Sequence, residues 1–410
     1  MELWSQWDAA RAPPALSAVP AALPDATRIP PREWLYGTRL VRRFVSVLAA
    51  PGGVGKSVLA LGQAVSLASG RPLLGERVHH SVPVWVFDLE DPLEEMHRRL
   101  AAFLRLHLVP DDAVAGRLFL HSGRTRRLSL AALGPDGAIV RPDQESLTAA
   151  ALAAGVGLIV VDPFIKSHTL DENSNPHMDA AATAWAEVAE RTGAAVLLVH
   201  HVRKLGPNGI ADVESARGAK ALTDAARSAS LLSAMTLEEA ERLGVAPGER
   251  WRHVRLDDAK ANLAPRAEIA LWYRLESVGL GNATALYPAG DQVAAVASWK
   301  PASPFGTLPP ADCNQALDAI AAGPGEGQFY SALRGGFGGN ERWAGRVLLR
   351  FGLDEAQAAR VLAAWLRSGL LVEREYRDPV HRKTRRGVTV VDAKRPTVAA
   401  EHGTQDDNGT

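Results

Sequence analysis

The stretch Ala50-Pro51-Gly52-Gly53-Val54-Gly55-Lys56-Ser57 decides how this chain folds, because it has the residues of a phosphate-binding loop. An apolar run at residues 44–48 precedes it and predicts a buried parallel strand, and residues 58–68 after it predict a helix. A strand, a glycine-rich loop and a helix in this order are the context that the motif requires. The first position is alanine instead of the usual glycine, so we expect the end of the strand to accommodate a Cβ atom.

The residues of this loop predict a binding site for Mg-ATP. Gly52, Gly53 and Gly55 allow backbone N–H groups to surround phosphates at the positive end of the helix. Lys56 would reach the β- and γ-phosphates, and the Ser57 hydroxyl would bind Mg²⁺. A glycine-rich turn with a chance lysine is the alternative, but the spacing and the flanking elements disfavour it. The predicted nucleotide-binding residues are Pro51, Gly52, Gly53, Val54, Gly55, Lys56, Ser57 and Val58.

Composition indicates a soluble protein of two or three domains. The chain has 410 residues, 47% of them apolar, and its 46 Lys and Arg balance 46 Asp and Glu. Overall charge therefore does not indicate a polyanionic partner. The single cysteine, Cys313, excludes an internal disulfide framework. No apolar run is long enough to span a membrane, and residues 1–25 lack the pattern of a secretory signal, so a cytoplasmic location is expected.

The order of apolar runs predicts an α/β fold with a mostly parallel sheet. Between residues 28 and 278, short apolar strands alternate with helical stretches, which is typical of a sheet covered by helices on both faces. Prolines at the N-terminus indicate a mobile arm, and Gly, Ala and Pro indicate a linker before a second unit. The predicted parts are an arm (1–28), an ATPase domain (29–280), a linker (281–310), a C-terminal domain (311–392) and a disordered tail (393–410).

Two predicted strands end in acidic residues. The apolar run at 157–161 ends in Asp162, which would hold Mg²⁺ beside the phosphate loop; a cap of the next turn is the alternative. The strand at 84–89 is followed by Glu90, a candidate to orient and polarise the attacking water, although a plain surface acid fits the spacing too. Asp91 instead suits the start of a helix at Pro92.

A third apolar strand, residues 195–199, ends in the pair His200-His201. A polar group at this position can hydrogen-bond the γ-phosphate or the water and report the state of the nucleotide, so His200 is predicted as a sensor. A histidine whose ring has only structural hydrogen bonds at the end of the strand is equally compatible with the pattern. Zinc binding is disfavoured because no further ligands cluster nearby.

Taken together, these motifs resemble those of RecA-type P-loop ATPases, and most closely the RepA-like hexameric replicative helicases. The resemblance covers residues 28–275 and rests on the order of its motifs. These are Pro31-Arg32-Glu33-Trp34-Leu35, the phosphate loop, Leu89-Glu90-Asp91-Pro92, Val160-Val161-Asp162-Pro163, His200-His201, the segment 215–227 and Lys260-Ala261-Asn262.

The resemblance implies catalysis shared between subunits of a homo-hexamer. By position, Arg227 matches the arginine finger and Lys260 the accompanying lysine that act on a neighbour's nucleotide. An inserted arginine stabilises charge on the transferring phosphoryl group. From the sequence alone, Arg227 would instead lie on the solvated face of a helix over residues 219–232. Arg217 competes for the finger role, and Arg99 matches a position near the base.

Two regions carry cations suited to DNA. Loops after the predicted strands contain Lys166, Arg203 and Lys204, and in the resembling rings such loops line a channel for single-stranded DNA; solvated connections are the alternative. Residues 326–395 hold 14 Lys and Arg against 8 Asp and Glu. A helix at 354–369, with an apolar face, and strands at 370–376 and 387–391 predict a winged helix. Its basic tip would contact duplex DNA, or the module would bind protein; the tip residues are Arg382, Lys383, Arg385 and Arg386.

The resulting hypothesis is a RecA-like ATPase with a C-terminal winged helix that acts as an ATP-driven DNA motor or helicase in the replication of a plasmid, phage or other mobile element. The alternative is an ATP-switched DNA-binding regulator or initiator that unwinds nothing. A recombinase filament would need a subunit-exchange strand, which the proline-rich arm does not offer.

Overall fold

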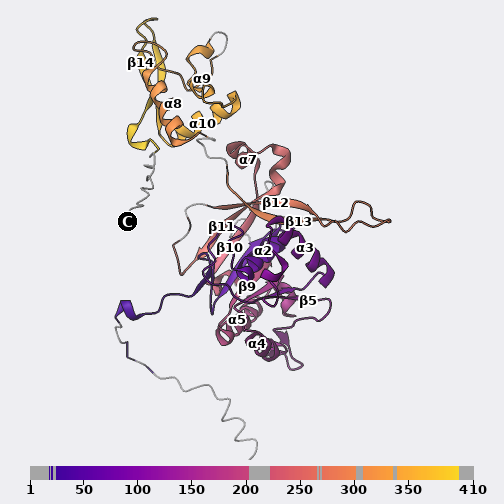
Figure 1. Cartoon of the computed structure of the whole chain (residues 1–410). Coiled ribbons are helices and arrows are strands. Elements are labelled where there is room, and N and C mark those ends of the chain that lie inside the picture. The colour runs from indigo at the N-terminus through magenta and orange to yellow at the C-terminus, as the bar shows by residue number, and fades with distance from the viewer. Residues whose placement is uncertain are drawn as a thin grey trace, which may run out of the picture.

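The computed structural model describes residue 18 and residues 20–21, 25–202, 222–265, 267, 270–301, 308–335 and 339–396. Its main feature is a nine-stranded sheet (Figure 1). In spatial order the strands are β13 (Gln292–Trp299), β12 (Leu271–Gly279), β11 (His253–Ala261), β10 (Ser228–Ala234), β3 (Val45–Ala50), β9 (Ala195–His201), β8 (Leu158–Asp162), β4 (Val84–Asp88) and β5 (Leu118–Ser122).

The strands from β10 to β5 are parallel, and β11, β12 and β13 extend the sheet in antiparallel pairs. The mostly parallel sheet predicted from the sequence is therefore confirmed. Since parallel strands end at one edge of the sheet, the ends of β3, β9, β8, β4 and β5 lie together. The phosphate loop follows β3, so all functional side chains at these strand ends lie near it.

Helices cover both faces of the parallel part. Successive residues of β8 belong to different cores: Leu158 and Val160 pack in one, Ile159 and Val161 in the other. This follows from the alternation of side chains along a strand. Strands with two buried faces read as continuous apolar runs, which is why the sequence revealed them. One face carries α2 (Lys56–Ser69) and α3 (Leu93–Leu106), and the other α4 (Gln144–Ala153) and α5 (Asn175–Thr192).

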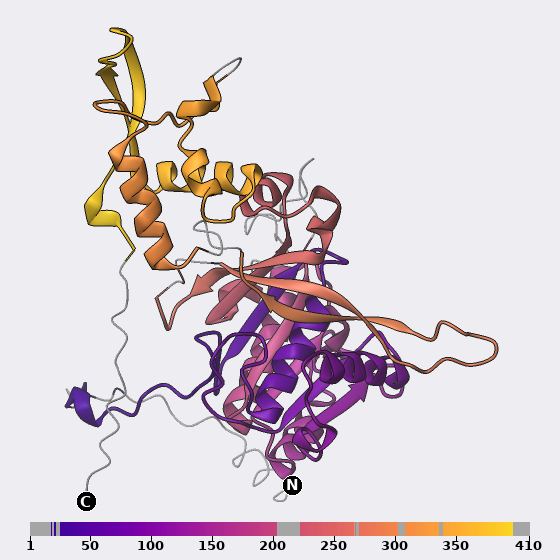
Figure 2. The same cartoon turned by 45° about the horizontal axis from the view of Figure 1, so that its top comes forward.

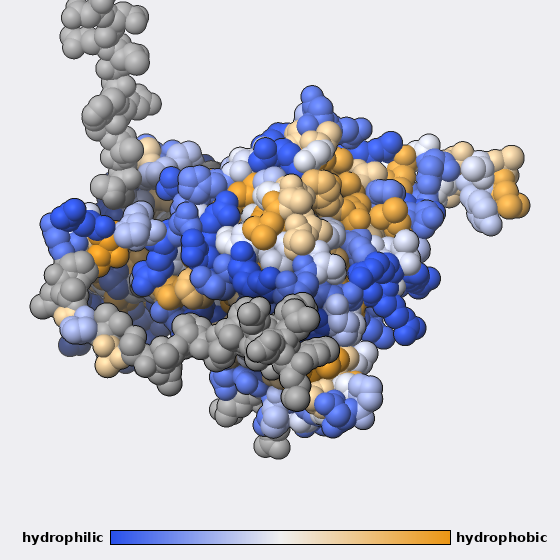
Figure 3. Space-filling view, turned by 90° about the horizontal axis from the view of Figure 1, so that it is seen from below, coloured by the Kyte–Doolittle hydropathy of each residue, from blue (hydrophilic) through white to orange (hydrophobic). Residues whose placement is uncertain are grey.

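Strands β12 and β13 form a long hairpin whose distal loop projects from the body (Figure 2). The expectation of a linker over 281–310 is therefore wrong for residues 292–299, which belong to the sheet of the first domain. Seen from below, the projecting loop carries apolar residues at its end (Figure 3), where Leu286 and Tyr287 are exposed. Residues near the base of the loop, Val278, Leu280, Val293 and Ala295, pack against α3.

The remaining elements of the first domain are short. They connect the main strands or border the sheet. They are η1 (Ala26–Arg28), β1 (Trp34–Tyr36), β2 (Leu40–Val41), η2 (Asp111–Ala113), β6 (Ala132–Leu133), β7 (Ile139–Val140), η3 (Phe164–Ser167), α7 (Leu237–Leu243) and η5 (Pro247–Arg252).

The C-terminal unit has a core of its own around Trp343 and Trp365. Helix α10 begins with a capping box at Asp354, and its predicted apolar face is buried apart from Leu366, which is partly buried. Antiparallel strands β14 and β15 form the predicted hairpin. The elements are α8 (Pro310–Ala322), η6 (Gly339–Arg342), α9 (Gly345–Leu349), α10 (Glu355–Arg367), β14 (Leu371–Arg377), β15 (Thr384–Val390) and η7 (Asp392–Lys394).

The helix expected over 219–232 is wrong at its C-terminal part. Residues 222–225 are helical, but β10 begins at Ser228 and lies between β3 and β11. The alanine-rich sequence favours a helix locally, and burial between two strands overrides that preference. Most of the predicted arm and tail lies outside the described residues, although Ala26–Arg28 of the arm forms η1. Within the described part of the chain, no helix is both long and apolar enough to cross a membrane.

Candidate functional site

The phosphate loop connects β3 directly to α2. Ala50, the alanine at the position of the usual glycine, is the last residue of β3 and is fully buried. Gly53 and Gly55 have φ angles of 80° and 97°, a region that side chains with a Cβ atom rarely adopt. Gly55 is also the N-cap of α2, so the loop ends where free backbone N–H groups meet the positive end of the helix. The local geometry is suited to binding an anion.

Asp162 lies at the end of β8, two strands from β3. Its carboxylate accepts a hydrogen bond from the Ser57 hydroxyl, which brings the two predicted metal ligands together. Burial raises the pKa of Asp162 to about 6, while Ser57 and the charge of Lys56 lower it. A buried carboxylate beside a hydroxyl matches the oxygen ligands of Mg²⁺, which usually takes one or two from protein and others from phosphate or water. Among the described residues, no cluster of three His, Cys, Asp or Glu suits a metal.

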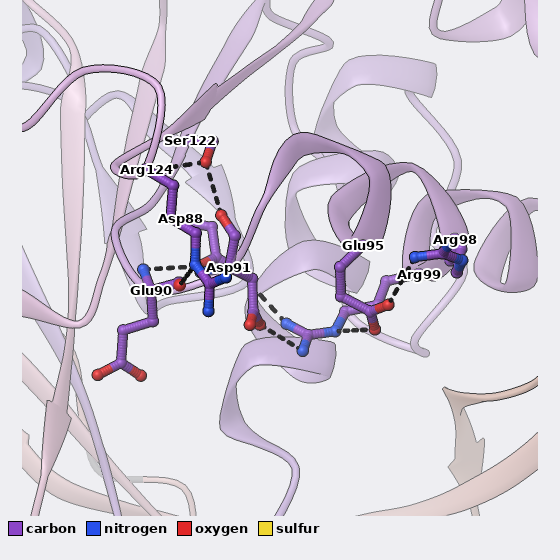
Figure 4. Close-up of polar contacts among 8 residues, drawn as sticks. All are labelled: Asp88, Glu90, Asp91, Glu95, Arg98, Arg99, Ser122 and Arg124. Atoms are coloured by element: carbon purple, nitrogen blue, oxygen red, sulfur yellow. Dashed lines mark hydrogen bonds and ion pairs between the residues drawn. The ribbon is translucent and has the colours of Figure 1, made fainter.

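Glu90 belongs to a loop that two other segments hold in place (Figure 4). The Asp88 carboxylate accepts hydrogen bonds from the backbone N–H groups of Glu90 and Asp91, at 3.0 and 2.8 Å. Ser122, the last residue of β5, donates from Oγ to the Asp91 carbonyl at 2.6 Å, and Arg124 in the loop after β5 donates from Nε to the Glu90 carbonyl at 2.6 Å. These contacts hold the backbone and leave the exposed Glu90 carboxylate available.

Arg99 of α3 connects the acidic residues next to this loop. Its guanidinium lies 3.3 Å from the Asp88 carboxylate, 2.5 Å from that of Asp91 and 3.3 Å from that of Glu95 (Figure 4). Asp91 therefore pairs with Arg99 instead of capping α3, whose N-cap is Pro92. Burial raises the pKa of Asp88, and Arg99 lowers it.

The two histidines at the end of β9 have different surroundings. His200 pairs with Ala49 and His201 with Ala50 across the β3–β9 ladder, so both lie beside the start of the phosphate loop. Burial lowers the pKa of His200 to about 4, and its ring contacts that of Phe164, with centroids 6.2 Å apart. Burial also lowers the pKa of His201, which Lys56 lowers further and Glu90 raises. The charges of the catalytic candidates Lys56 and Glu90 therefore act on His201 and not on the predicted sensor His200.

Arg227 and Lys260 lie at the other edge of the sheet. Arg227 precedes β10, and its backbone N–H donates to the carbonyl of Val45, the first residue of β3. The Asn262 N–H donates to the Arg227 carbonyl, so Lys260 on β11 is close by; its ammonium donates to the Thr223 and Asp224 carbonyls at 2.9 Å each. A strand of six residues rises by roughly 16 Å. The two cations are therefore distant from the phosphate loop of their own chain.

The cations predicted to contact DNA have mixed surroundings. Lys166 is exposed on η3, whereas Arg203 and Lys204 lie outside the described residues, as does Arg217, the alternative candidate for the arginine finger. At the β14–β15 tip, Arg382 and Lys383 are exposed. Arg385 turns toward buried Asp378, at 3.2 Å, and Arg386 lies 3.6 Å from Glu375. Because Arg385 is paired with Asp378 and so helps to hold the tip together, its guanidinium is less available to DNA than the sequence predicts.

A cavity of about 530 Å³ opens beside the phosphate loop. The sequence located the wall formed by the loop and α2, and the resemblance placed Arg99 of α3 near the base, but the sequence missed Glu95 and Arg98 of α3 and the wall formed by the β12–β13 hairpin. It also missed Ser122 and Arg124. No local motif marks any of these residues, since their role depends on contacts with segments distant in the chain. A second cavity of about 20 Å³, enough for one water molecule, touches Ser57, Asp88 and Asp162.

Comparisons with known proteins found one family model and several solved structures that match part of the chain. A family model described as AAA domain matches residues 10–207, which include the phosphate loop, Glu90, Asp162 and His200. Two solved structures, one of an ATPase domain and one of a DnaB-like replicative helicase and its interactions with primase, are each 13% identical and match 56% of this chain. They are covered to 81% and 55% of their own lengths, with TM-scores of 0.41 and 0.42. Both scores lie below 0.5, so we infer neither fold nor function from them. The region that carries the nucleotide-site candidates is thus similar to the AAA domain family.

Proposed function

We propose that this protein is an ATP-hydrolysing DNA motor of the helicase type that acts in DNA replication. One observation carries the proposal: a phosphate loop, a buried aspartate that hydrogen-bonds the loop's serine, and an exposed glutamate on a braced loop lie at the same edge of a parallel sheet. This combination supplies what hydrolysis of a phosphoanhydride requires, namely positioning, charge stabilisation and a carboxylate for water.

Each residue has a separate role. The amides of the loop and Lys56 hold the phosphates, and Ser57 and Asp162 would hold Mg²⁺, which neutralises charge on the phosphate oxygens. Glu90 orients and polarises the attacking water. His201 lies beside the start of the phosphate loop, and the ring of His200 contacts that of Phe164, the first residue of η3. This path would connect hydrolysis to Lys166, the exposed cation on η3.

The position of Arg227 and Lys260 supports a homo-oligomer, which we propose to be a hexamer. They lie at the amino edge of the sheet and the phosphate loop at the carboxyl edge, so neither cation can reach the nucleotide of its own chain. In a ring of identical subunits with head-to-tail contacts, the amino edge of one subunit can face the nucleotide of the next. The two cations would then complete the neighbour's site.

Single-stranded DNA would pass Lys166 in the central channel. The C-terminal unit, which we propose is a winged helix, would place Arg382 and Lys383 against duplex DNA. The excess of Lys and Arg in this unit supports such a contact. A basic hairpin domain also favours the second candidate function, an ATP-switched DNA-binding regulator that binds duplex DNA without separating it.

Steady-state ATP hydrolysis with and without single-stranded DNA tests the proposal, together with separation of a forked duplex. We expect stimulation by DNA and strand separation, and we expect Lys56→Ala and Glu90→Gln to abolish both. DNA binding with unstimulated hydrolysis and an intact fork would favour the regulator. Undiminished ATP affinity and turnover in Lys56→Ala would refute both candidates.

Mixed oligomers test the shared site. Neither Lys56→Ala nor Arg227→Ala protein should hydrolyse ATP by itself. In an equal mixture, roughly a quarter of the interfaces combine an intact loop with an intact Arg227, so turnover should return. Full activity of an isolated monomer would remove any role of Arg227 in the neighbour's site.

A further inference from the structure

We infer that Asp258 of β11 is a positioning residue for the boundary between subunits. Its buried ion pair with Arg39 holds the end of β11, and with it Lys260, in the place from which Lys260 would act on a neighbour's nucleotide. The inference rests on the proposed function, because it takes Lys260 and Arg227 to complete the site of the adjacent subunit. It identifies the contacts that hold these two cations at the amino edge of the sheet.

Arg39 connects two acidic side chains inside the first domain. One end of its guanidinium lies 2.7 Å from Asp258 Oδ1, and the other end is paired with Glu76. Only 8% of each of these three side chains is exposed. A guanidinium presents its donors in a rigid, planar fork, so the pairing with Glu76 fixes the direction in which Arg39 faces Asp258. Burial also makes such a pair costly to separate, because a charge in the interior would lose its partner.

The pair also attaches β11 to the central strand β3. The Arg39 carbonyl accepts a hydrogen bond from the Ser46 hydroxyl of β3, at 2.7 Å. At its other oxygen, Asp258 Oδ2, the carboxylate accepts from the backbone N–H of Ala267, at 3.0 Å. Asp258 comes before Lys260 in the chain and Ala267 comes after it. One carboxylate therefore holds the backbone on both sides of Lys260 and connects it to the core.

A β-bulge lies next to this anchor. Ala259 is the extra residue of β11 between Asp258 and Lys260 in the β10–β11 ladder. In a regular strand Asp258 and Lys260 would share one face of the sheet. The bulge instead directs Lys260 to the opposite face, where its ammonium donates to the Thr223 and Asp224 carbonyls. Because a bulge interrupts the ladder, the direction of Lys260 depends on contacts outside the ladder, and the carboxylate of Asp258 supplies them.

Arg227 is attached to the same end of β11. The Asn262 N–H donates to the Arg227 carbonyl at 3.1 Å, and the Arg227 N–H donates to the Val45 carbonyl at 3.2 Å. Both candidate cations thus belong to a section of backbone that β3 and the Arg39–Asp258 pair hold in place. Since this section lies at the amino edge, its displacement should affect the neighbour's site and not the phosphate loop of the same chain.

Asp258→Asn in the full-length protein tests the inference. The amide keeps the size of the side chain, but its single oxygen cannot replace both carboxylate oxygens toward Arg39 and Ala267. A displacement of about 1 Å can cost about 10²-fold in rate, so we expect kcat for ATP hydrolysis to fall about 10- to 100-fold, with ADP affinity within about twofold. Asp257→Asn is the matched control, because this partly exposed neighbour pairs with Arg255 instead, and it should change neither.

Mixed oligomers distinguish a positioning role from a purely structural one. The equal mixture of Lys56→Ala and Arg227→Ala sets the scale, since roughly a quarter of its interfaces are complete. Asp258→Asn mixed with Lys56→Ala should reach a similar turnover, because Lys56→Ala supplies an intact amino edge. Asp258→Asn mixed with Arg227→Ala should stay at least about threefold lower, because neither protein supplies one.

Arg39→Lys guards against a folding defect of Asp258→Asn. A lysine can pair with only one of the two acids, so this variant should show the same unequal recovery with the two partner variants. Thermal unfolding shows that each variant is folded. Wild-type kcat in folded Asp258→Asn, or equal recovery with both partner variants, would overturn the positioning role alone. If the mixture of Lys56→Ala and Arg227→Ala recovered no turnover, the shared site of the proposed function would fail, and the inference with it.

Discussion

Gly123 controls the position of the loop that carries Glu90, and Gly123→Ala tests this control. A Cβ atom at Gly123 would lie 2.7 Å from the Cα atom of Leu89 and 2.8 Å from its carbonyl oxygen. Carbon atoms normally approach to about 3.5 Å, so the two backbone segments would have to separate by roughly 0.8 Å. Both contacted atoms belong to the backbone, and rotation of a side chain cannot relieve the overlap.

The shift would be transmitted to Glu90, the next residue after Leu89. The hydrogen bond from the Gly123 N–H to the Asp88 carbonyl, now 2.8 Å, would be strained as well. A misplacement of about 1 Å in catalytic geometry can cost about 10²-fold in rate. We therefore expect Gly123→Ala to lower kcat for ATP hydrolysis by about 10- to 100-fold. Overpacking should also lower the free energy of unfolding by about 1–3 kcal/mol.

Three measurements distinguish a displaced Glu90 from a general loss of folding or of nucleotide binding: kcat, ADP affinity and thermal unfolding. ADP affinity should stay within about twofold, because the phosphate loop follows a different strand. Gly248→Ala is the matched control, since a Cβ atom there meets nothing within 4 Å, and it should change none of the three. Arg124→Ala, which removes the donor to the Glu90 carbonyl, should lower kcat in the same direction as Gly123→Ala. A folded Gly123→Ala protein with wild-type kcat would refute the reasoning.

Three further predictions concern titratable groups of the first domain. His201→Ala should lower kcat about tenfold or more, and His200→Ala should lower it less, measured by steady-state ATP hydrolysis; the opposite ranking would return the sensor role to His200. Asp162→Asn should abolish turnover measured with Mg²⁺, yet in Mg²⁺-free buffer at pH 7–8 it should raise the free energy of unfolding by up to about 3 kcal/mol. The reason is that a carboxyl pKa raised by burial, from 3.8 to about 6, destabilises the folded state above that pH; unchanged or lower stability in denaturant titrations would contradict this. Burial lowers the pKa of His168 from 6.5 to about 4, so the unfolded chain binds the proton first and stability falls as the pH drops between these values. His168→Leu should remove up to about 3 kcal/mol of this loss, and equal slopes for variant and wild type between pH 6.5 and 4 would exclude it.

Local pattern was sufficient for the elements that carry the phosphate site. Helix α3 begins at Leu93, next to Pro92, where the sequence predicts the start of a helix, and its apolar residues recur on one face while charged residues cover the other. The parallel strands are buried on both faces, so they appear as apolar runs that end in polar residues. These strand ends meet at one sheet edge, and for this reason Lys56, Glu90 and Asp162 could be grouped from the amino-acid sequence alone.

Pattern failed where contacts between distant segments decide the structure. The sequence of β13 is Gln-Val-Ala-Ala-Val-Ala-Ser-Trp, and its small residues give a weak strand signal. Pairing with β12 over the whole length of β13 makes it a strand. Similarly, Gly123 braces residues more than thirty positions earlier in the chain, and nothing in its own neighbourhood indicates this. The hairpin and the brace thus became visible only in three dimensions.

The candidate catalytic residues of one chain lie at two opposite edges of the sheet, so a single chain does not bring all of them to one site. Parallel strands bring loops with acids and amides to the carboxyl edge, and this edge gathers the groups that we propose bind phosphate and activate water. The positive charge that would stabilise the transferring group, Arg227, belongs to the amino edge, beside the first residue of β3. No movement of side chains can bridge a strand length of roughly 16 Å. If Arg227 takes part in hydrolysis at all, it must do so in another copy of the chain, and ATP turnover should therefore depend on protein concentration wherever the oligomer dissociates.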